Sequence, residues 1–188
     1  MTMSYSTNKA LVLGGARSGK SRFAEQLVRQ WSQQHDAKCH YVATAVPFDQ
    51  EMAERIHHHQ QQRGQGWCEH EAPLHLAERL SLFGADDVVL VDCLTVWLNN
   101  WLFEFGEQAS NEKLEQKVAQ LASVVKESPA QIILVSNEVG LGVVPLGQIS
   151  RLFVDNAGRM NQSLAQVCDN VTLIAAGLPL ILKSSGHQ

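Results

Sequence analysis

The chain has 188 residues, of which 45% are hydrophobic and 18% are charged, and its formal net charge is −4. This length fits one globular domain over residues 1–188 better than two, and the apolar content argues against a disordered chain. A mildly acidic protein has no general attraction for nucleic acid or for anionic membranes. Any phosphate group that it binds must therefore be held by a local site.

No segment is typical of a membrane span or a signal peptide. The longest nearly apolar stretch, Val171 to Leu182, is interrupted by polar, glycine and proline residues, whereas a membrane-spanning helix needs roughly 18 apolar residues in a row. The first nine residues, MTMSYSTNK, lack a basic start and a long apolar stretch. The four cysteines lie far apart without a C-x-x-C pair, which favours free thiols in a reducing cytosol over disulfides or a zinc site. We therefore expect a cytoplasmic protein with frayed tails at residues 1–8 and 184–188.

Short β-branched runs alternate along the chain with longer amphipathic segments, which predicts an α/β fold with a mostly parallel sheet flanked by helices. The predicted strands are Ala10–Leu13, His40–Ala45, a weak candidate at Trp67–Glu71, Val88–Asp92, Ile132–Val135 and Val171–Ile174. The predicted helices are Ser21–Gln34, Gln50–Arg63, Thr95–Phe105, Glu112–Lys126 and Ser150–Val167. Ser110 is a candidate cap for the fourth of these helices, and Pro129 would stop it. The glycine-rich stretch from Glu138 to Gly147 predicts a loop at the ligand-binding edge of the sheet.

A phosphate-binding motif follows the first predicted strand. The sequence GGARSGKS fits G-x-x-x-x-G-K-[ST] and has the required strand before it and helix after it. Its glycines allow a tight turn that points backbone N–H groups at phosphate oxygens, and the helix adds the positive end of its dipole. The nucleotide phosphates would be held by Gly14, Gly15, Ala16, Arg17, Ser18, Gly19, Lys20 and Ser21. A chance glycine-rich turn is the alternative, but the context favours a P-loop NTPase-like fold.

Three of these side chains have expected roles in chemistry. Lys20 would reach the β- and γ-phosphates, and the Ser21 hydroxyl would ligate Mg²⁺. Asp92 ends a predicted strand and is the natural carboxylate for the same Mg²⁺. The motif leaves the reaction open, because kinases, hydrolysing motors and switches share it.

Three consecutive histidines, His57, His58 and His59, lie two residues after Arg55 in a polar predicted helix. A shared metal site is disfavoured, because consecutive helical residues point about 100° apart. A solvated helix face is one remaining reading. In the other, a neutral imidazole attacks a nucleotide α-phosphorus to form a phosphoramidate, and Arg55 stabilises the developing charge. The residues by themselves leave both readings open.

Other polar and aromatic residues have candidate structural roles, which for some of them compete with a role at the site. Trp97 and Trp101, four apart on a predicted helix, favour the core or a subunit interface over ligand contact. Asn137 and Glu138 fit equally a loop anchor and a role near Mg²⁺ or a substrate hydroxyl. Arg159 fits the polar face of a long helix.

Taken together, eight sequence blocks resemble one family in order and spacing. They are GGARSGKSRFAE (Gly14–Glu25), YVATA (Tyr41–Ala45), E-M-x-x-R-I-x-H-H (Glu51–His59), Trp67 with Glu71, VLVDCLTVWLNN (Val89–Asn100), VSNEVGLGVVP (Val135–Pro145), DNAGRMNQSLA (Asp155–Ala165) and GLPLILK (Gly177–Lys183). The family is that of the bifunctional adenosylcobinamide kinase / adenosylcobinamide-phosphate guanylyltransferases of cobalamin biosynthesis. The sequence departs from the family pattern at Leu13, His57 and Gly64, where other residues are usual.

The resemblance implies two activities on one chain. The first transfers the γ-phosphoryl group of ATP or GTP to a hydroxyl of adenosylcobinamide. The second transfers GMP from GTP to that phosphate through a GMP-histidine, giving adenosylcobinamide-GDP and pyrophosphate. The family's histidine is the first of the final His-His pair, which is His58 here. The resemblance also implies a homo-oligomer, specifically a trimer, acting on small molecules.

The resemblance extends the nucleotide site beyond the phosphate loop. The residues that it implies are Ala43, Thr44, Ala45, His59, Gln60, Gln61, Gln62, Glu71 and Val91. A carboxylate such as Glu71 would read the N1–H and N2–H₂ donors of guanine, which adenine lacks as a pair. Two rival functions remain: a kinase that has lost guanylyl transfer, and a nucleotide-dependent switch without turnover.

Overall fold

The computed structural model describes residues 9–45, 65–143 and 145–185. These residues form one sheet in the order β3-β2-β4-β5-β1-β6-β7. The strands are β1 (Lys9–Gly14), β2 (Lys38–Ala43), β3 (Trp67–Glu71), β4 (Asp87–Asp92), β5 (Gln131–Asn137), β6 (Asn170–Ala175) and β7 (Leu178–Lys183). All neighbours run parallel except β7, which is antiparallel to β6. The predicted parallel α/β fold is confirmed, including the weak strand candidate β3.

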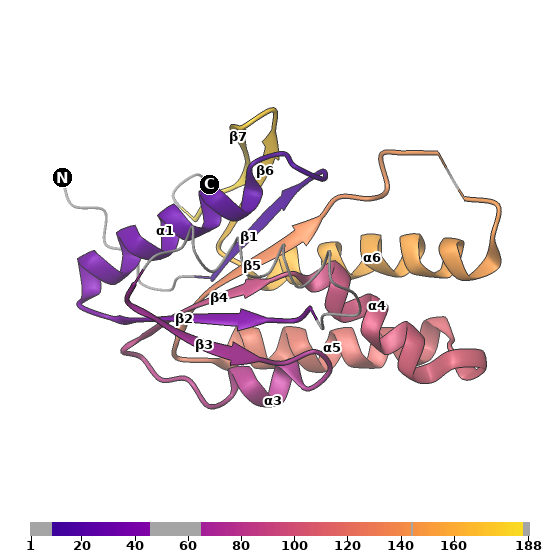
Figure 1. Ribbon diagram of the computed structural model, residues 1–188, viewed down its shortest axis with the longest axis horizontal. Coiled ribbons are helices and arrows are strands. Elements are labelled where there is room, and N and C mark those ends of the chain that lie inside the picture. The colour runs from indigo at the N-terminus through magenta and orange to yellow at the C-terminus, as the bar shows by residue number, and fades with distance from the viewer. Residues whose placement is uncertain (1–8, 46–64, 144, 186–188) are drawn as a thin grey trace.

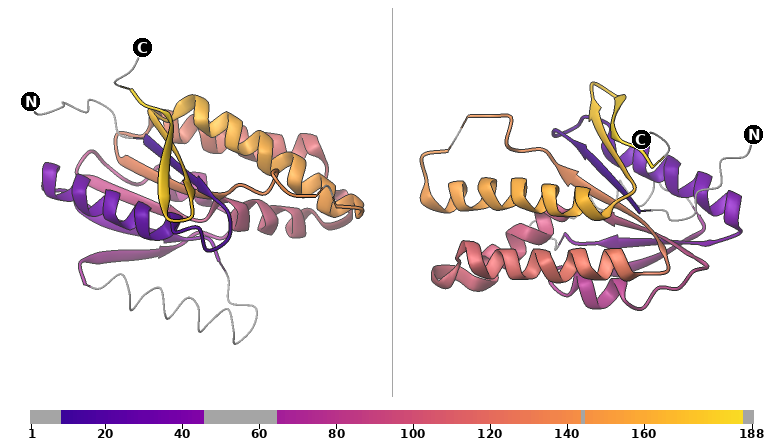
Figure 2. Two further views of the ribbon diagram at one scale, coloured as in Figure 1. Left: turned by 90° about the horizontal axis from the view of Figure 1, so that it is seen from above. Right: turned by 180° about the vertical axis from the view of Figure 1, so that it is seen from behind.

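Helices cover both faces of the sheet (Figures 1 and 2). They are α1 (Lys20–His35), α3 (Leu76–Leu80), α4 (Leu94–Phe105), α5 (Asn111–Glu127) and α6 (Gln148–Val167), with a short 3₁₀ turn η1 (Gly106–Gln108). The apolar residues of α1 pack on one face, and those of the other four helices pack on the opposite face. The described helices are thus unevenly distributed, and α1 stands by itself over the phosphate-loop side.

Hydrophobic burial explains why these segments fold as they do. β1, β4 and β5 are buried almost throughout, as near-continuous apolar strands covered on both faces should be. In α5 the buried residues Leu114, Val118, Leu121 and Val125 recur at intervals of four, three and four, so one face of the helix meets the core. The predicted cap is confirmed, since the Ser110 hydroxyl accepts a hydrogen bond from the Lys113 N–H at 3.3 Å.

The larger core lies between the sheet and helices α3 to α6. Trp97 and Trp101 are 1% and 8% exposed there, so the core alternative for both is confirmed. The Trp97 indole N–H donates to the Leu74 carbonyl at 2.8 Å, which satisfies its polar atom. In contrast, Arg159 hydrogen-bonds Asn111 and ion-pairs with Glu115, which joins the polar faces of α6 and α5.

Besides the short turn η1, two described elements were not predicted. α3 is only five residues long, which is too short to show helical periodicity. β7 lacks polar–apolar alternation because all six of its residues are exposed on the edge of the sheet. It folds back through Ala176 and Gly177, whose φ angles of 51° and 78° suit a tight hairpin turn.

The predicted helix Gln50–Arg63 lies outside the described residues. In the described part of the chain, no helix is both long and apolar enough to cross a bilayer.

Candidate nucleotide site

The register of the parallel strands brings the predicted site residues to one edge of the sheet. Gly14, at the end of β1, pairs with Asn137 on β5, and Asp92, at the end of β4, pairs with Val135 on the same strand. On the other side of β4, Asp92 pairs with Ala43 of β2. The carboxyl ends of β1, β2, β4 and β5 therefore open together, which is where parallel α/β sheets bind ligands.

The phosphate loop needs glycine at its first position. A Cβ atom on Gly14 would lie 2.4 Å from the Ser18 hydroxyl oxygen and 2.7 Å from the Ile174 carbonyl oxygen. Both separations are shorter than any van der Waals contact. The loop continues through positive φ angles of 56° at Arg17 and 97° at Gly19, and the second suits glycine because it carries no side chain.

Backbone hydrogen bonds from distant segments hold the loop. The Gly177 N–H, in the β6–β7 turn, donates to the Ser18 carbonyl at 2.9 Å. The Glu138 N–H, directly after β5, donates to the Gly14 carbonyl at 3.1 Å. The hairpin that was not predicted thus supports the loop from one side and the end of β5 supports it from the other.

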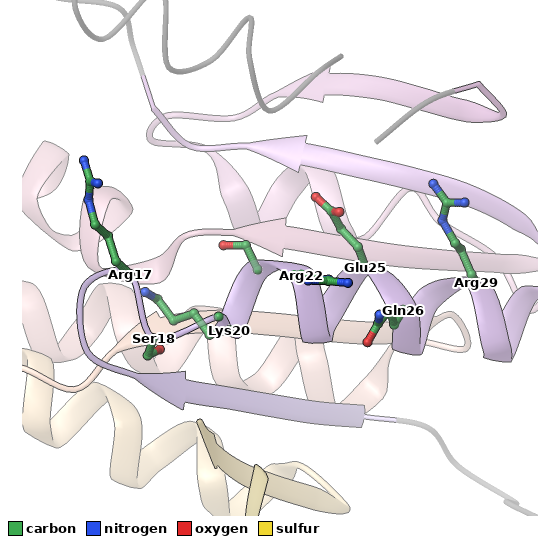
Figure 3. A pocket seen from close by; sticks show the side chains of 9 residues that line it. Arg17, Ser18, Lys20, Arg22, Glu25, Gln26 and Arg29 are labelled. Carbon is green, nitrogen blue, oxygen red and sulfur yellow. The ribbon is translucent and has the colours of Figure 1, made fainter. Parts of the chain in front are cut away.

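The loop opens into a cleft of about 720 Å³ that runs along α1 (Figure 3). Its lining consists of Arg17, Ser18, Gly19, Lys20, Ser21, Arg22, Glu25, Gln26 and Arg29. The Lys20 ammonium group donates to the Gly15 carbonyl at 3.0 Å, across the mouth of the loop. Four cations and one carboxylate line the cleft, so its charge suits a polyphosphate.

The donor set at the loop also suits a hard divalent cation. Ser21 lies in the first turn of α1 and Asp92 at the end of β4, and both are partly exposed at the ligand edge. Hydroxyl and carboxylate oxygens are the ligands that Mg²⁺ prefers. The neighbouring thiol offers no such ligand at neutral pH, because burial, followed by the charge of Asp92, raises the pKa of Cys93.

A second group of residues joins the ends of β2 and β4. The Thr44 hydroxyl donates to the Cys93 carbonyl at 2.7 Å and accepts from the Cys93 N–H at 2.9 Å. The Asn100 side-chain amide donates to the carbonyls of Thr44 and Pro73, both at 2.9 Å. Thr44 is wholly buried and Asn100 is 9% exposed. These contacts fix the backbone where β2 leaves the sheet.

Asn100 is a positioning residue that our sequence reasoning missed. The sequence contained a sign of this role. An asparagine on the apolar face of a predicted helix is buried, and its side-chain amide must then find hydrogen-bond partners. Asn137 also acts as an anchor, since its amide donates to the Thr95 hydroxyl at 3.2 Å. That contact supports the anchor reading of Asn137.

The remaining predicted site residues lie in different places. Ala45 follows Thr44 at the ligand edge, whereas the Val91 side chain is fully buried beneath that edge. Glu71 is exposed at the end of β3 and lines a smaller cleft of about 300 Å³ with residues of the α3 region. His58, His59, Gln60, Gln61 and Gln62 lie outside the described residues. The structure therefore brings together the phosphate loop, Thr44, Ala45 and Asp92, and it places Glu71 in a different cleft.

Comparison with known proteins identifies relatives over almost the whole chain. The chain is 47% identical to the bifunctional adenosylcobalamin biosynthesis protein CobP of Pseudomonas aeruginosa, over 92% of this chain and 96% of the relative. It is 39% identical to the bifunctional adenosylcobalamin biosynthesis protein CobU of Escherichia coli, over 92% and 98%. A KaiC-like protein from Pyrococcus horikoshii has 12% identity and a TM-score of 0.49, covering 88% of this chain and 70% of its own. A likeness that low adds nothing to what the sheet topology already shows.

The family model described as cobinamide kinase / cobinamide phosphate guanyltransferase matches residues 10–182. This range includes the phosphate loop, Asp92 and all seven strands, apart from Lys9 at the start of β1 and Lys183 at the end of β7. The chain therefore belongs to the cobinamide kinase / cobinamide phosphate guanyltransferase family of enzymes.

Proposed function

We propose that this protein phosphorylates adenosylcobinamide with ATP or GTP and then transfers GMP from GTP to the new phosphate through a GMP-histidine on His58. The observation that carries the proposal is the single ligand edge, where the phosphate loop and Asp92 open beside the cleft along α1. Family membership supports the choice of these two reactions over the other uses of a phosphate loop.

In the kinase step, the acceptor hydroxyl oxygen attacks the γ-phosphorus, and its proton passes to water. The bond from the γ-phosphorus to the bridging oxygen breaks, and the nucleoside diphosphate leaves with the electron pair. Lys20 would turn from the Gly15 carbonyl to the β- and γ-phosphates, where it binds the charge of the transferring group. Backbone N–H groups of the loop would hold the same phosphates.

In the guanylyl step, a neutral nitrogen of His58 attacks the α-phosphorus of GTP. A P–N bond forms, the bond from the α-phosphorus to the bridging oxygen breaks, and pyrophosphate leaves with the electron pair. An oxygen of cobinamide phosphate then attacks the same phosphorus and displaces the histidine, which regains its lone pair. Glu71 would select guanine in this scheme by accepting from its N1–H and N2–H₂ groups.

Ser21 and Asp92 would hold Mg²⁺ beside the phosphates. When bound, the ion neutralises charge on the β- and γ-phosphate oxygens. The role of these two residues is to keep oxygen ligands at the ligand edge of β4 and at the start of α1. We also propose that the protein acts in the cytoplasm as a homo-oligomer, a trimer by family resemblance.

The deciding experiment incubates the purified protein with α-labelled GTP and Mg²⁺, without corrinoid. We expect label on wild-type protein and on the His57→Ala control, and none on His58→Ala. The label should be labile in acid and stable in alkali, as a phosphoramidate is. His58→Ala should keep most kinase activity, whereas Lys20→Ala should lose at least about 100-fold in both reactions because both use a bound triphosphate.

Three outcomes would contradict the proposal. Kinase activity without any labelled protein would indicate a kinase that has lost guanylyl transfer. Tight GTP binding with neither reaction, and no effect of His58→Ala, would indicate a nucleotide-dependent switch. Label on His58→Ala but not on His57→Ala would move the intermediate by one residue.

A further inference from the structure

Glu138 is a carboxylate at the ligand edge that the proposed function leaves without a role. It follows Asn137, the last residue of β5, and β5 lies between β1 and β4 in the sheet (Figure 1). Its backbone N–H donates to the carbonyl of Gly14, the first residue of the phosphate loop. Glu138 therefore begins the segment that leaves the sheet between the phosphate loop and Asp92.

The site of γ-phosphoryl transfer lies near the end of β5. Lys20 comes from the segment after β1, and Cys93 directly follows β4. Burial is the largest influence on the pKa of Cys93 and raises it, whereas the charge of Lys20 is one of the smaller influences that lower it. The Lys20 ammonium group is thus within electrostatic range of Cys93, and β5 lies between the two strands that these residues follow. A γ-phosphate bound by Lys20 would therefore lie close to the first residue after β5, which is Glu138.

One oxygen of the Glu138 carboxylate is held in place and the other is open. Its Oε1 accepts a hydrogen bond from the Gly140 N–H at 2.9 Å. Within the described part of the chain, no group donates to the second oxygen, and the side chain is partly exposed. A carboxylate that is fixed through one oxygen presents the other as an oriented acceptor. The hydroxyl group that attacks the γ-phosphorus is a donor that fits it.

We propose that Glu138 is the base that accepts the proton of the acceptor hydroxyl in the kinase step. This role rests on the proposed function. The hydroxyl oxygen forms its bond to the γ-phosphorus as its proton moves to the open carboxylate oxygen. The bond from the γ-phosphorus to the bridging oxygen breaks, and the nucleoside diphosphate leaves with the electron pair. Glu138 then gives the proton to water and is a carboxylate again.

The guanylyl step has no use for this base. His58 attacks through the lone pair of a neutral nitrogen, and that nitrogen has no proton to lose. The second attack comes from an ionised phosphate oxygen, which has none either. A base at Glu138 therefore serves only the kinase step, whereas a ligand of Mg²⁺ or a support of the phosphate loop would serve both steps, because both use a bound triphosphate.

The test compares both reactions in the same purified variants. Glu138→Gln keeps the size of the side chain and an oxygen that can accept from the Gly140 N–H, but it cannot take a proton. We expect the kcat of adenosylcobinamide phosphorylation to fall by about 100-fold or more, with KM for both substrates within about 3-fold of wild type. Labelling of the protein by α-labelled GTP should stay within about 3-fold of wild type, because it needs no base at this position.

Two further variants serve as controls. Glu138→Asp keeps a carboxylate and should recover part of the kinase kcat. Glu127→Gln removes the same charge from an exposed position at the end of α5, just before β5 and thus at the opposite edge of the sheet. Both reactions of Glu127→Gln should match those of wild type.

Three results would overturn the proposal. The first is a kinase kcat in Glu138→Gln within about 3-fold of wild type. The second is an equal loss in phosphorylation and in labelling, which would indicate a Mg²⁺ ligand or a loop support. The third is a loss confined to KM, which would indicate that Glu138 only binds the acceptor. Failure of the proposed function is distinguishable, because wild-type protein itself would then transfer no phosphoryl group to adenosylcobinamide.

Discussion

The two sides of the ligand edge are held by different kinds of contact. On the phosphate-loop side, Gly177 and Glu138 donate backbone N–H groups to loop carbonyls. These two hydrogen bonds use no side-chain atom, although the φ angle of 78° favours glycine at position 177. On the β2–β4 side, Thr44 and Asn100 use side chains, and their hydrogen bonds join residues 49 and 56 positions apart. The phosphate loop is therefore held by main-chain hydrogen bonds from distant segments. The β2–β4 side depends instead on the side chains of two particular polar residues, Thr44 and Asn100.

The largest expected effect on stability comes from breaking the β2–β4 side. Asn100→Ala removes the donor to two carbonyls, Thr44 and Pro73, in a buried place. We expect the free energy of unfolding to fall by about 2–4 kcal/mol, because two acceptors lose their partner. Urea unfolding measures the change, with Asn99→Ala, at the more exposed neighbouring position, as the matched control. Equal losses in the two variants would show that Asn100 is no anchor.

A smaller loss of stability is expected from the phosphate-loop side. Gly14→Ala places a methyl group 2.7 Å from the Ile174 carbonyl oxygen, so the loop or β6 must shift. We expect a loss of about 1–3 kcal/mol in unfolding free energy, together with at least about 10-fold weaker GTP binding as the loop carbonyls and N–H groups move. Calorimetric titration and urea unfolding give both values. A Cβ on Gly15 would meet nothing within 4 Å, so Gly15→Ala should cost less stability, and the reverse order would refute this account.

The smallest expected effect on stability comes from the histidines near the start of β2 and β4, at the end of these strands away from the ligand edge. There the His40 ring bonds His70 and the Asp87 carboxylate, each at 3.0 Å. Burial, then the charges of His40 and Arg79, lowers the pKa of His70 below its ordinary 6.5. For Asp87, burial by itself raises the pKa, but hydrogen bonds from the Gly84 N–H and from His40 outweigh it and lower the pKa below 3.8.

The sign of the pH dependence follows from these directions. A histidine whose folded pKa is lowered binds its proton more readily in the unfolded chain, so its contribution to stability is complete above pH 6.5 and decreases below it. The contribution of Asp87 decreases only below pH 3.8. Between about pH 7.5 and about pH 5, His70→Asn should therefore show a shallower fall in urea midpoint than wild type. Parallel curves for the two proteins would contradict the assignment.

Much of the fold could be predicted from local patterns. Apolar runs such as Val88–Asp92 predict strands, the Ser110 cap and the spacing of buried residues predict α5, and the phosphate loop is evident from GGARSGKS alone. These features depend on residues that are near one another in sequence. β7 could not be predicted, because an exposed edge strand shows no alternation of polar and apolar residues. The predicted role of Val91 as a nucleotide contact conflicts with the structure, in which its side chain is fully buried.

The sequence by itself predicted a phosphate-binding loop at the start of α1, and resemblance over ordered blocks indicated the family. Only the tertiary structure decided what surrounds that loop. The Gly177 turn and the Asn100 bridge to Thr44 bring together residues that no spacing in the sequence connects. The physical reason is that a local motif encodes its own backbone conformation, whereas the register of parallel strands decides which distant residues become its neighbours.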